Sequence, residues 1–259
     1  MCVVAKPEPG EFESDEAFLA HFRPGDYERP SVTVDVVVLT VREAQLCALL
    51  CRRRYRPFLG VWALPGRFLR GDEGLDDAAR DVLMDKGGLD EPYLEQLYTF
   101  GEPGRDPRPP RVISVAYMAL ADLRRVEEAV ARPGDARYVA PLRVGWTGQA
   151  GGPVDALGPD GQPLELAFDH SHILGTSVLR LRGKLDYAPV GFELLPGDFT
   201  LRQLQVIHEA VLGRPLNKDS FRRRMLAGGQ LVATGRREAD VAYRPAELYR
   251  FVRRPGKRP

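Results

Sequence analysis

The chain has 259 residues, with 44% hydrophobic residues, 28% charged residues and a formal net charge of +1, which is ordinary for a soluble globular protein. No apolar run approaches the ~20 residues that a membrane-spanning helix needs, and residues 1–10 lack the apolar segment of a signal peptide. Three cysteines are too few for a disulfide framework or a zinc site, so we expect a cytoplasmic protein of one or two domains.

The net charge conceals an uneven distribution along the chain. Residues 200–259 contain fourteen Lys or Arg and five Asp or Glu, whereas residues 1–199 contain 23 basic and 31 acidic residues. An acidic body followed by a basic C-terminal segment indicates a polyanionic partner for that segment. The alternative is a solvated basic tail, which only the last six residues resemble.

The first third of the chain predicts an arm followed by two strands. Residues 1–29 are polar and rich in Pro and Gly except near 16–22, so we expect an arm or short helix that packs on the body. Residues 31–41 are mostly β-branched, which is typical of a strand covered on both faces. A second strand is predicted at 46–54, ending in three consecutive arginines.

Residues 64–89 (LPGRFLRGDEGLDDAARDVLMDKGGL) have the outline of a Nudix box, the loop–helix–loop that holds metal and diphosphate in Nudix hydrolases. The pattern G-x5-E-x7-R-E-U-x-E-E-x-G-U, in which U is apolar, aligns Glu73 with its first acidic position. Arg67 replaces the opening glycine, while Val82 and Lys86 replace two carboxylates. Because Mg²⁺ is held by oxygen ligands, Val82 removes a ligand and Lys86 repels the ion. We therefore expect a Nudix fold without catalysis, with neither a metal site nor a cofactor.

For the second half of the box we favour a plain amphipathic helix over 73–86 whose apolar side chains face a core. Further strands are predicted at 94–100 and 112–120, on either side of a loop rich in Gly, Pro and Arg. Residues 132–163 hold much of the Gly and Pro of the chain and are expected to be loop around short strands.

A helix is predicted within 166–184, with Asp169 as its N-cap. His170 and His172 at its start could bind a metal, but no third ligand of matching spacing lies nearby. We favour surface or capping roles for both histidines.

The C-terminal segment predicts two short helices. Thr200 and Gln203 form a capping box that opens the first helix, and Gly213 ends it. Asn217 caps the second helix, 218–226, whose inward side chains we expect to include Leu226. Two short helices separated by a Gly-Arg-Pro-Leu turn match a helix-turn-helix, whose second helix can enter a major groove.

Two strands, 230–234 and 242–251, are predicted after the second helix, around a basic tip at 235–240. Helix arginines can contact base edges and phosphates, and wing arginines mainly phosphates or the minor groove. The alternative is a small dimerisation or docking domain. The predicted contacts to double-stranded DNA come from nine residues: Asn217, Lys218, Ser220, Arg222, Arg223, Arg224, Arg236, Arg237 and Arg244.

The chain resembles the NrtR family of Nudix-related transcriptional regulators. The resemblance is carried by motifs at 27–35 (YERPSVTVD), 62–66 (WALPG), 111–117 (RVISVAY), 181–187 (LRGKLDY) and 244–250 (RPAELYR). It implies an α/β (α+β) fold, namely a Nudix-type α/β/α sandwich with a mixed sheet and then a winged helix-turn-helix domain. It also implies a homodimeric repressor of operons for NAD or sugar metabolism, with ADP-ribose or a related nucleotide as effector.

The domain boundaries expected from this organisation are an arm at 1–29, a ligand-sensing domain at 30–190 and a DNA-binding domain at 191–259. Cationic side chains beside aromatic rings suit a nucleotide diphosphate. By position, the residues expected to line the ligand pocket are Arg52, Arg54, Arg56, Trp62, Arg67, Phe100 and Arg105. Arg67 lies where the loop approaches phosphate. It therefore either hinders the binding of ADP-ribose or supplies a positive charge that holds the diphosphate in place of the lost metal.

Two other functions stay open from the sequence. One is an active Nudix ADP-ribose pyrophosphatase with an accessory domain, which would release AMP in a metal-dependent reaction. The other is a non-enzymatic docking protein without salt-dependent affinity for DNA.

Overall fold

The computed structural model describes residues 12–23, 25, 27–90, 92–134, 136–239 and 244–252. The first eleven residues of the predicted arm and the first two of the last predicted strand therefore lie outside the described residues. Within these ranges, no helix is both long and apolar enough to cross a membrane.

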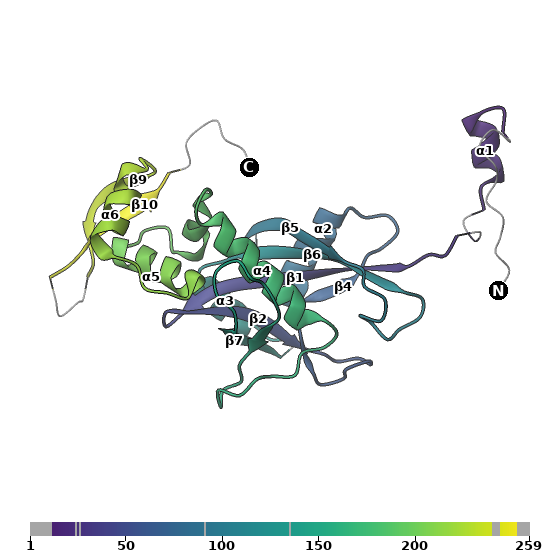
Figure 1. The fold of residues 1–259 in the computed structure, drawn as a ribbon, viewed down its shortest axis with the longest axis horizontal. Coiled ribbons are helices and arrows are strands. Elements are labelled where there is room, and N and C mark those ends of the chain that lie inside the picture. The colour runs from purple at the N-terminus through teal and green to yellow at the C-terminus, as the bar shows by residue number, and fades with distance from the viewer. Residues whose placement is uncertain are drawn as a thin grey trace.

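A mixed sheet forms the centre of the molecule (Figure 1). Its strands lie in the order β5 (Tyr93–Phe100), β6 (Val112–Leu120), β1 (Ser31–Arg42), β2 (Gln45–Arg52), β7 (Arg137–Val144) and β8 (Val154–Ala156). Two short strands join its centre, β3 (Trp62–Ala63) beside β2 and β4 (Gly66–Phe68) beside β1. Strand β1 runs parallel to β6 and antiparallel to β2 and β4.

Strand β1 is buried on both faces, as its run of β-branched residues predicts. Val36 and Val38 pack with side chains of α2 (Leu75–Val82) and α3 (Leu123–Ala131). Val37 and Leu39 point to the other face, where they pack with side chains of α4 (His170–Lys184). A mixed sheet between two helical layers confirms the predicted α/β/α sandwich.

Three elements in this half differ from the expectations. The box helix ends at Val82 and continues as a π-helical turn, η2 (Leu83–Gly87), which Gly88 terminates with a φ of 69°. Helix α3 was not predicted, although Asp122 caps it through the N–H of Arg125. Helix α1 (Asp15–His21) has no buried residue and lies apart from the sheet (Figure 1), so the expectation that the arm packs on the body is wrong for this described helix.

The C-terminal segment folds as the predicted winged helix, after a 3-10 turn, η3 (Pro189–Leu194). The capping box of Thr200 and Gln203 opens α5 (Leu201–Leu212), and Gly213 ends it with a φ of 67°. The Asn217 side chain caps α6 (Lys218–Ala227) by accepting the N–H of Ser220.

The wing is an antiparallel pair, β9 (Leu231–Arg237) and β10 (Glu247–Phe251). Strand β9 runs further than predicted, so Arg236 and Arg237 lie on the strand and not at the tip of the wing. Leu226 on α6 is 39% exposed, which corrects the expectation that it faces inward.

The winged helix lies at one end of the molecule and α1 at the other (Figure 1). One hydrophobic cluster includes Val37 and Ile173 of the body together with Leu204, Phe221 and Tyr249 of the winged helix. The two halves of the chain therefore share a continuous core.

Candidate functional site

A cavity of about 300 Å³ opens where strands β1 and β4 meet the loops at 53–56, 105–108 and 168–170. Carboxylates of Asp35 and Asp106 reach its wall. The cations that line it outnumber them: Arg53, Arg56, Arg67, Lys86, Arg105 and Arg108. The cavity therefore suits an anion.

Two guanidinium groups lie close to the ring of Phe168 on this wall. The Arg53 guanidinium lies 4.7 Å from the ring centroid and that of Arg108 lies 5.2 Å from it. Arg108 also lies 4.7 Å from the centroid of Phe68. Phe168 has a φ of 55°, in the left-handed region that aromatic residues rarely adopt, so the surrounding contacts must hold it there.

Ion pairs hold two of these arginines in place. Arg105 is 4% exposed and donates to both carboxylate oxygens of Asp169, at 2.9 and 2.6 Å. Asp169 is the N-cap residue of α4, as predicted, but its side chain pairs with Arg105 and makes no capping hydrogen bond. Arg108 forms a similar pair with Asp106. Burial alone would raise the pKa of Asp106, but hydrogen bonds from Arg108 hold it below its usual value.

His170 is buried beside Asp35, which corrects the surface or capping role predicted for it. Its Nδ1 accepts the backbone N–H of Leu64 at 2.9 Å, and its Nε2 lies 3.9 Å from Asp35. Burial lowers the pKa of His170, so the ring is neutral. The Asp35 carboxylate accepts a hydrogen bond from Ser114 at 2.5 Å. His172, by contrast, is exposed as predicted.

Arg67 links strand β4 to the loop and helix that follow it in the box. Its terminal nitrogens donate to both carboxylate oxygens of Glu73, with the Nη2 bond at 2.6 Å, and to Asp81 at 3.1 Å. Glu73 also accepts the backbone N–H of Arg70 at 2.5 Å. The Arg67 hydrogen bond, followed by that of Arg70, lowers the pKa of Glu73 to about 2. The Lys86 ammonium donates to the carbonyl of Gly66.

These contacts leave the box poorly suited to a divalent cation. Glu73 and Asp81 already bind a guanidinium, and Val82 is buried in the core. No cluster of three or more His, Cys, Asp or Glu suited to a metal forms within the described ranges. The side chains present do not fit Mg²⁺ or Mn²⁺, which need several free oxygen ligands.

The predicted pocket residues divide between two cavities. Arg56, Arg67 and Arg105 line the cavity described above. Arg52 and Arg54 line a neighbouring cavity of about 450 Å³, where they donate to the carbonyls of Gly60 and Gly134, at 2.9 and 3.0 Å.

Trp62 and Phe100 line neither of these two cavities, because both pack against the apolar core. The Trp62 ring lies 5.8 Å from that of Tyr138. Sequence reasoning missed Arg53 and Phe168. Arg53 stands in the arginine triplet, whereas nothing in the sequence marks Phe168.

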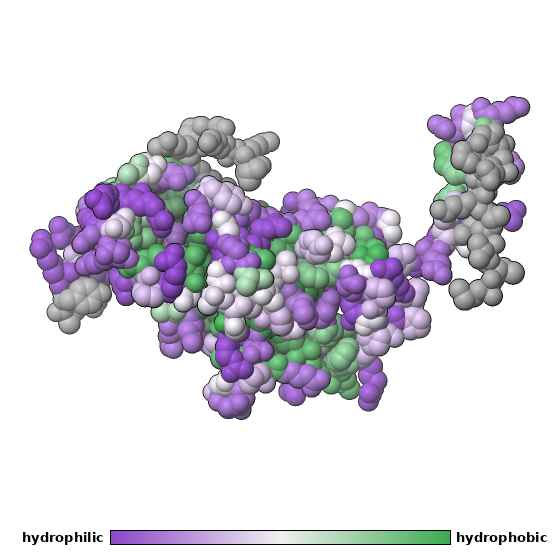
Figure 2. Space-filling model, in the orientation of Figure 1, coloured by the Kyte–Doolittle hydropathy of each residue, from purple (hydrophilic) through white to green (hydrophobic). Residues whose placement is uncertain are grey.

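Helix α6 presents a polar, cationic face. Arg222, Arg223 and Arg224 are all exposed, and Figure 2 shows hydrophilic side chains gathered over this end of the molecule. Arg224 lies 5.7 Å from the ring of Phe221. Arg223 makes no hydrogen bond or ion pair with any described residue, so its guanidinium is available to an external partner.

The remaining predicted DNA contacts occupy different settings. Lys218 and Ser220 are exposed on α6. Arg244, which lies just before β10 of the wing, is also exposed. Arg236 forms an ion pair with Asp198, just before α5, and Arg250 of β10 pairs with the same carboxylate. Arg237 donates to the carbonyl of Pro245 at 3.3 Å. These arginines therefore stabilise the wing internally, through Pro245, and link it to the segment before α5, through Asp198.

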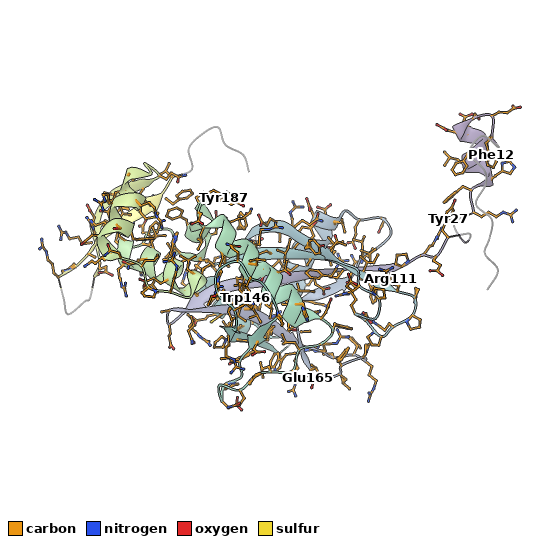
Figure 3. The ribbon with its side chains drawn as sticks, in the orientation of Figure 1. Phe12, Tyr27, Arg111, Trp146, Glu165 and Tyr187 are labelled. Atoms are coloured by element: carbon orange, nitrogen blue, oxygen red, sulfur yellow. The ribbon has the colours of Figure 1, made fainter. Side chains whose placement is uncertain are left out.

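Helix α4 connects the cavity to the winged helix. It begins beside Asp169 at the cavity, and near its other end Arg182 donates to the carbonyl of Val211 in α5 at 2.9 Å. Arg182 is 6% exposed and lies 4.7 Å from the ring centroid of Trp146, beside α4 (Figure 3). Lys184 pairs with Glu95 of β5.

Comparison with known proteins gives consistent similarities. Residues 191–251 match the model of the NrtR DNA-binding winged helix domain. The ADPR responsive transcriptional repressor NtrR of Acinetobacter baylyi is 37% identical over 243 residues, covering 93% of this chain and 90% of the repressor.

Two crystal structures have similar folds. Shewanella oneidensis NrtR complexed with a 27mer DNA is 35% identical with a TM-score of 0.71, covering 85% of this chain and 93% of that one. A MutT/nudix family protein from Enterococcus faecalis is 26% identical with a TM-score of 0.72, covering 92% and 93% of the two chains.

Proposed function

The chain belongs to the NrtR family of Nudix-related transcriptional regulators, and from that premise we propose that it is an ADP-ribose-responsive repressor that binds double-stranded DNA. The observation that carries the proposal is the exposed arginine face of α6, the second helix of the winged helix. Such a helix enters the major groove in helix-turn-helix proteins.

In this proposal, residues 191–259 bind DNA and residues 30–190 sense the effector. Arg222, Arg223 and Arg224 contact base edges and phosphates, while Arg244 beside the wing contacts phosphate. Arg236 and Arg237 set the position of the wing as well as adding positive charge. The protein acts as a homodimer, whose two α6 helices occupy successive major grooves.

The effector site is the cavity between Arg53, Arg67 and Arg105. Guanidinium groups bind the diphosphate of ADP-ribose or a related nucleotide, and the ring of Phe168 supports the base or ribose. The effector favours a dimer geometry in which the α6 helices no longer match the operator, so it releases DNA.

The close homologues of the chain are regulators, and we propose that this chain does not hydrolyse its effector. The guanidinium of Arg67 forms ion pairs with Glu73 and Asp81, so these carboxylates are not free to bind a metal ion. The ammonium of Lys86 adds a positive charge beside Gly66. An active pyrophosphatase would instead release AMP from ADP-ribose when Mg²⁺ or Mn²⁺ is added.

Arg223→Ala tests the DNA-binding role. We expect it to weaken binding to a fragment from upstream of the chain's own gene by about 1–3 kcal/mol, because Arg223 has no intramolecular partner among the described residues. Fluorescence anisotropy at several salt concentrations measures the effect. A loss confined to the cognate fragment marks a base contact, and a uniform loss across DNA sequences marks a phosphate contact.

The matched control is Arg124→Ala on α3, an exposed arginine whose ion pair among the described residues is with the exposed Glu128, and which should leave DNA binding unchanged. Absence of DNA binding by the unmodified protein at every salt concentration would refute the proposal.

A further inference from the structure

Two cations of the Nudix box, Arg67 and Lys86, stand at positions where the box pattern has other residues. Arg67 stands at the position of the opening glycine and Lys86 at that of a carboxylate. The Arg67 guanidinium lies against Glu73, the first acidic residue of the box, and against Asp81, which stands where the box has an arginine. The Lys86 ammonium lies on the loop carbonyl of Gly66. Both side chains line the cavity.

Each of the two cations retains hydrogen-bonding capacity. The Nε of Arg67 is buried and has no acceptor within the described ranges, which is costly for an N–H donor. An ammonium has three donors, and within the described part of the chain Lys86 donates to one acceptor, the carbonyl of Gly66. A phosphate oxygen in the cavity would accept from the remaining donors of Lys86 and lie near the positive charge of Arg67.

The charge of the whole cavity also favours an anion over a divalent cation. Arg105 and Arg108 pair with Asp169 and Asp106. Arg53, Arg56 and Lys86 also line the cavity and form no ion pair with a carboxylate of the described residues. A divalent cation would enter a site that is already positive, whereas a diphosphate would neutralise it.

We propose that Arg67 and Lys86 take the place of divalent cations, so that this cavity binds the diphosphate of a nucleotide without a metal ion. The inference rests on the proposed function, in which the effector is ADP-ribose or a related nucleoside diphosphate. It adds that sensing is independent of the Mg²⁺ or Mn²⁺ concentration, unlike diphosphate binding in a Nudix hydrolase.

Isothermal titration calorimetry of the full chain tests this, with ADP-ribose and inorganic pyrophosphate as probes. Each titration is run in excess EDTA and again in excess Mg²⁺. We expect ADP-ribose to bind with the same affinity in both buffers. Lys86→Met should weaken binding in EDTA by roughly tenfold or more, because a charge-assisted bond to phosphate is lost. Arg80→Met removes an exposed cation of α2 that faces Asp77 and should have no effect.

The double variant Arg67→Gly with Lys86→Glu restores the box pattern at two positions. We expect its ADP-ribose affinity to fall in EDTA and to recover in Mg²⁺, with the fold checked by circular dichroism. If this variant does not fold, Lys86→Met still tests the role of Lys86 in diphosphate binding. The substitution removes one hydrogen bond to the carbonyl of Gly66 among the described residues, so we expect the variant to fold.

Loss of ADP-ribose binding by the unmodified chain in EDTA, with recovery in Mg²⁺, would overturn the inference and leave the proposed effector intact. If pyrophosphate alone binds in EDTA, the metal-free site stands and the effector is a different diphosphate. If neither probe binds in either buffer, the inference and the proposed effector both fail.

Discussion

Arg67 places a positive charge among the carboxylates of the box. It lies on β4 opposite Val34 of β1, and its guanidinium reaches Glu73 and Asp81 beyond the next turn. Gly66, just before it, has no room for a side chain, because a Cβ there would lie 1.9 Å from the Asp35 carboxylate. The contacts of Arg67 with Glu73 and Asp81, and of Lys86 with Gly66, therefore link the loop to the rest of the box.

The Arg67–Glu73 pair predicts a specific pH dependence of stability. The pKa of Glu73 falls from 4.5 to about 2 in the folded chain. A carboxylate with a lowered pKa contributes stability above pH 4.5 and loses it as the pH falls toward 2. We expect the melting temperature of the unmodified protein to exceed that of Glu73→Gln at pH 6, and the difference to shrink below pH 4.5.

Thermal unfolding monitored by circular dichroism across this range measures the difference. Glu128→Gln, at an exposed glutamate of α3, is the control for removal of one carboxylate. A gap between the unmodified protein and Glu73→Gln that stays constant down to pH 2 would contradict the assigned role of the pair.

The sequence indicates some of the cavity residues but not their assembly. Arg56, Arg67 and Arg105 stand out because they are cations near the box or on a Gly- and Pro-rich loop. Phe168 is not identifiable, because its place depends on a left-handed backbone conformation and on arginines from two distant loops. Trp62 attracts attention as an aromatic residue beside the box, yet it packs toward Tyr138.

Among the elements of the described chain, α4 is the one that reaches from the anion cavity to the winged helix. Its first residues adjoin Arg105 and Asp35, and its last turns contact the C-terminal end of α5. A shift of the α4 N-terminus on effector binding would therefore be passed to the winged helix through a rigid element of fifteen residues.

Arg182→Lys tests this connection. Lysine keeps the charge but lacks the planar fork with which Arg182 bonds Val211 and stacks on Trp146. We expect the reduction of DNA affinity caused by ADP-ribose to become smaller, by about 1 kcal/mol of coupling free energy. Anisotropy titrations with and without ADP-ribose measure the change.

Arg180→Lys is the matched control, because Arg180 lies on the same helix but donates to Leu97 of β5, within the body. It should keep the full response. An undiminished ADP-ribose response in Arg182→Lys would exclude the α4–α5 contact as the route.

Elements with strong local signals are the ones that the sequence predicts well. The β-branched run of β1 and the capping box at Thr200 and Gln203 are both present in the structure. Helix α3 has only Val126 and Ala129 buried, so its apolar stripe is too narrow to stand out. The placement of α1 depends on tertiary packing, which no local pattern records.

At the scale of the whole molecule, the chain combines a cavity for an anion with a cationic face at one end. Figure 1 places the winged helix beyond the C-terminal end of α4, and Figure 3 shows Phe12 and Tyr27 on the arm at the opposite end. The shared hydrophobic cluster joins the sheet to α5 and α6, so the winged helix is fixed to the body through packed side chains. This arrangement suits a repressor in which an effector acts on DNA binding from a distance.

The most direct test is a titration of the unmodified protein against its upstream DNA fragment in excess EDTA, with and without saturating ADP-ribose. We expect salt-dependent binding of the DNA, and a fall in affinity of roughly fivefold or more when ADP-ribose is present. DNA affinity that is identical with and without ADP-ribose, while calorimetry shows that ADP-ribose is bound, would contradict it.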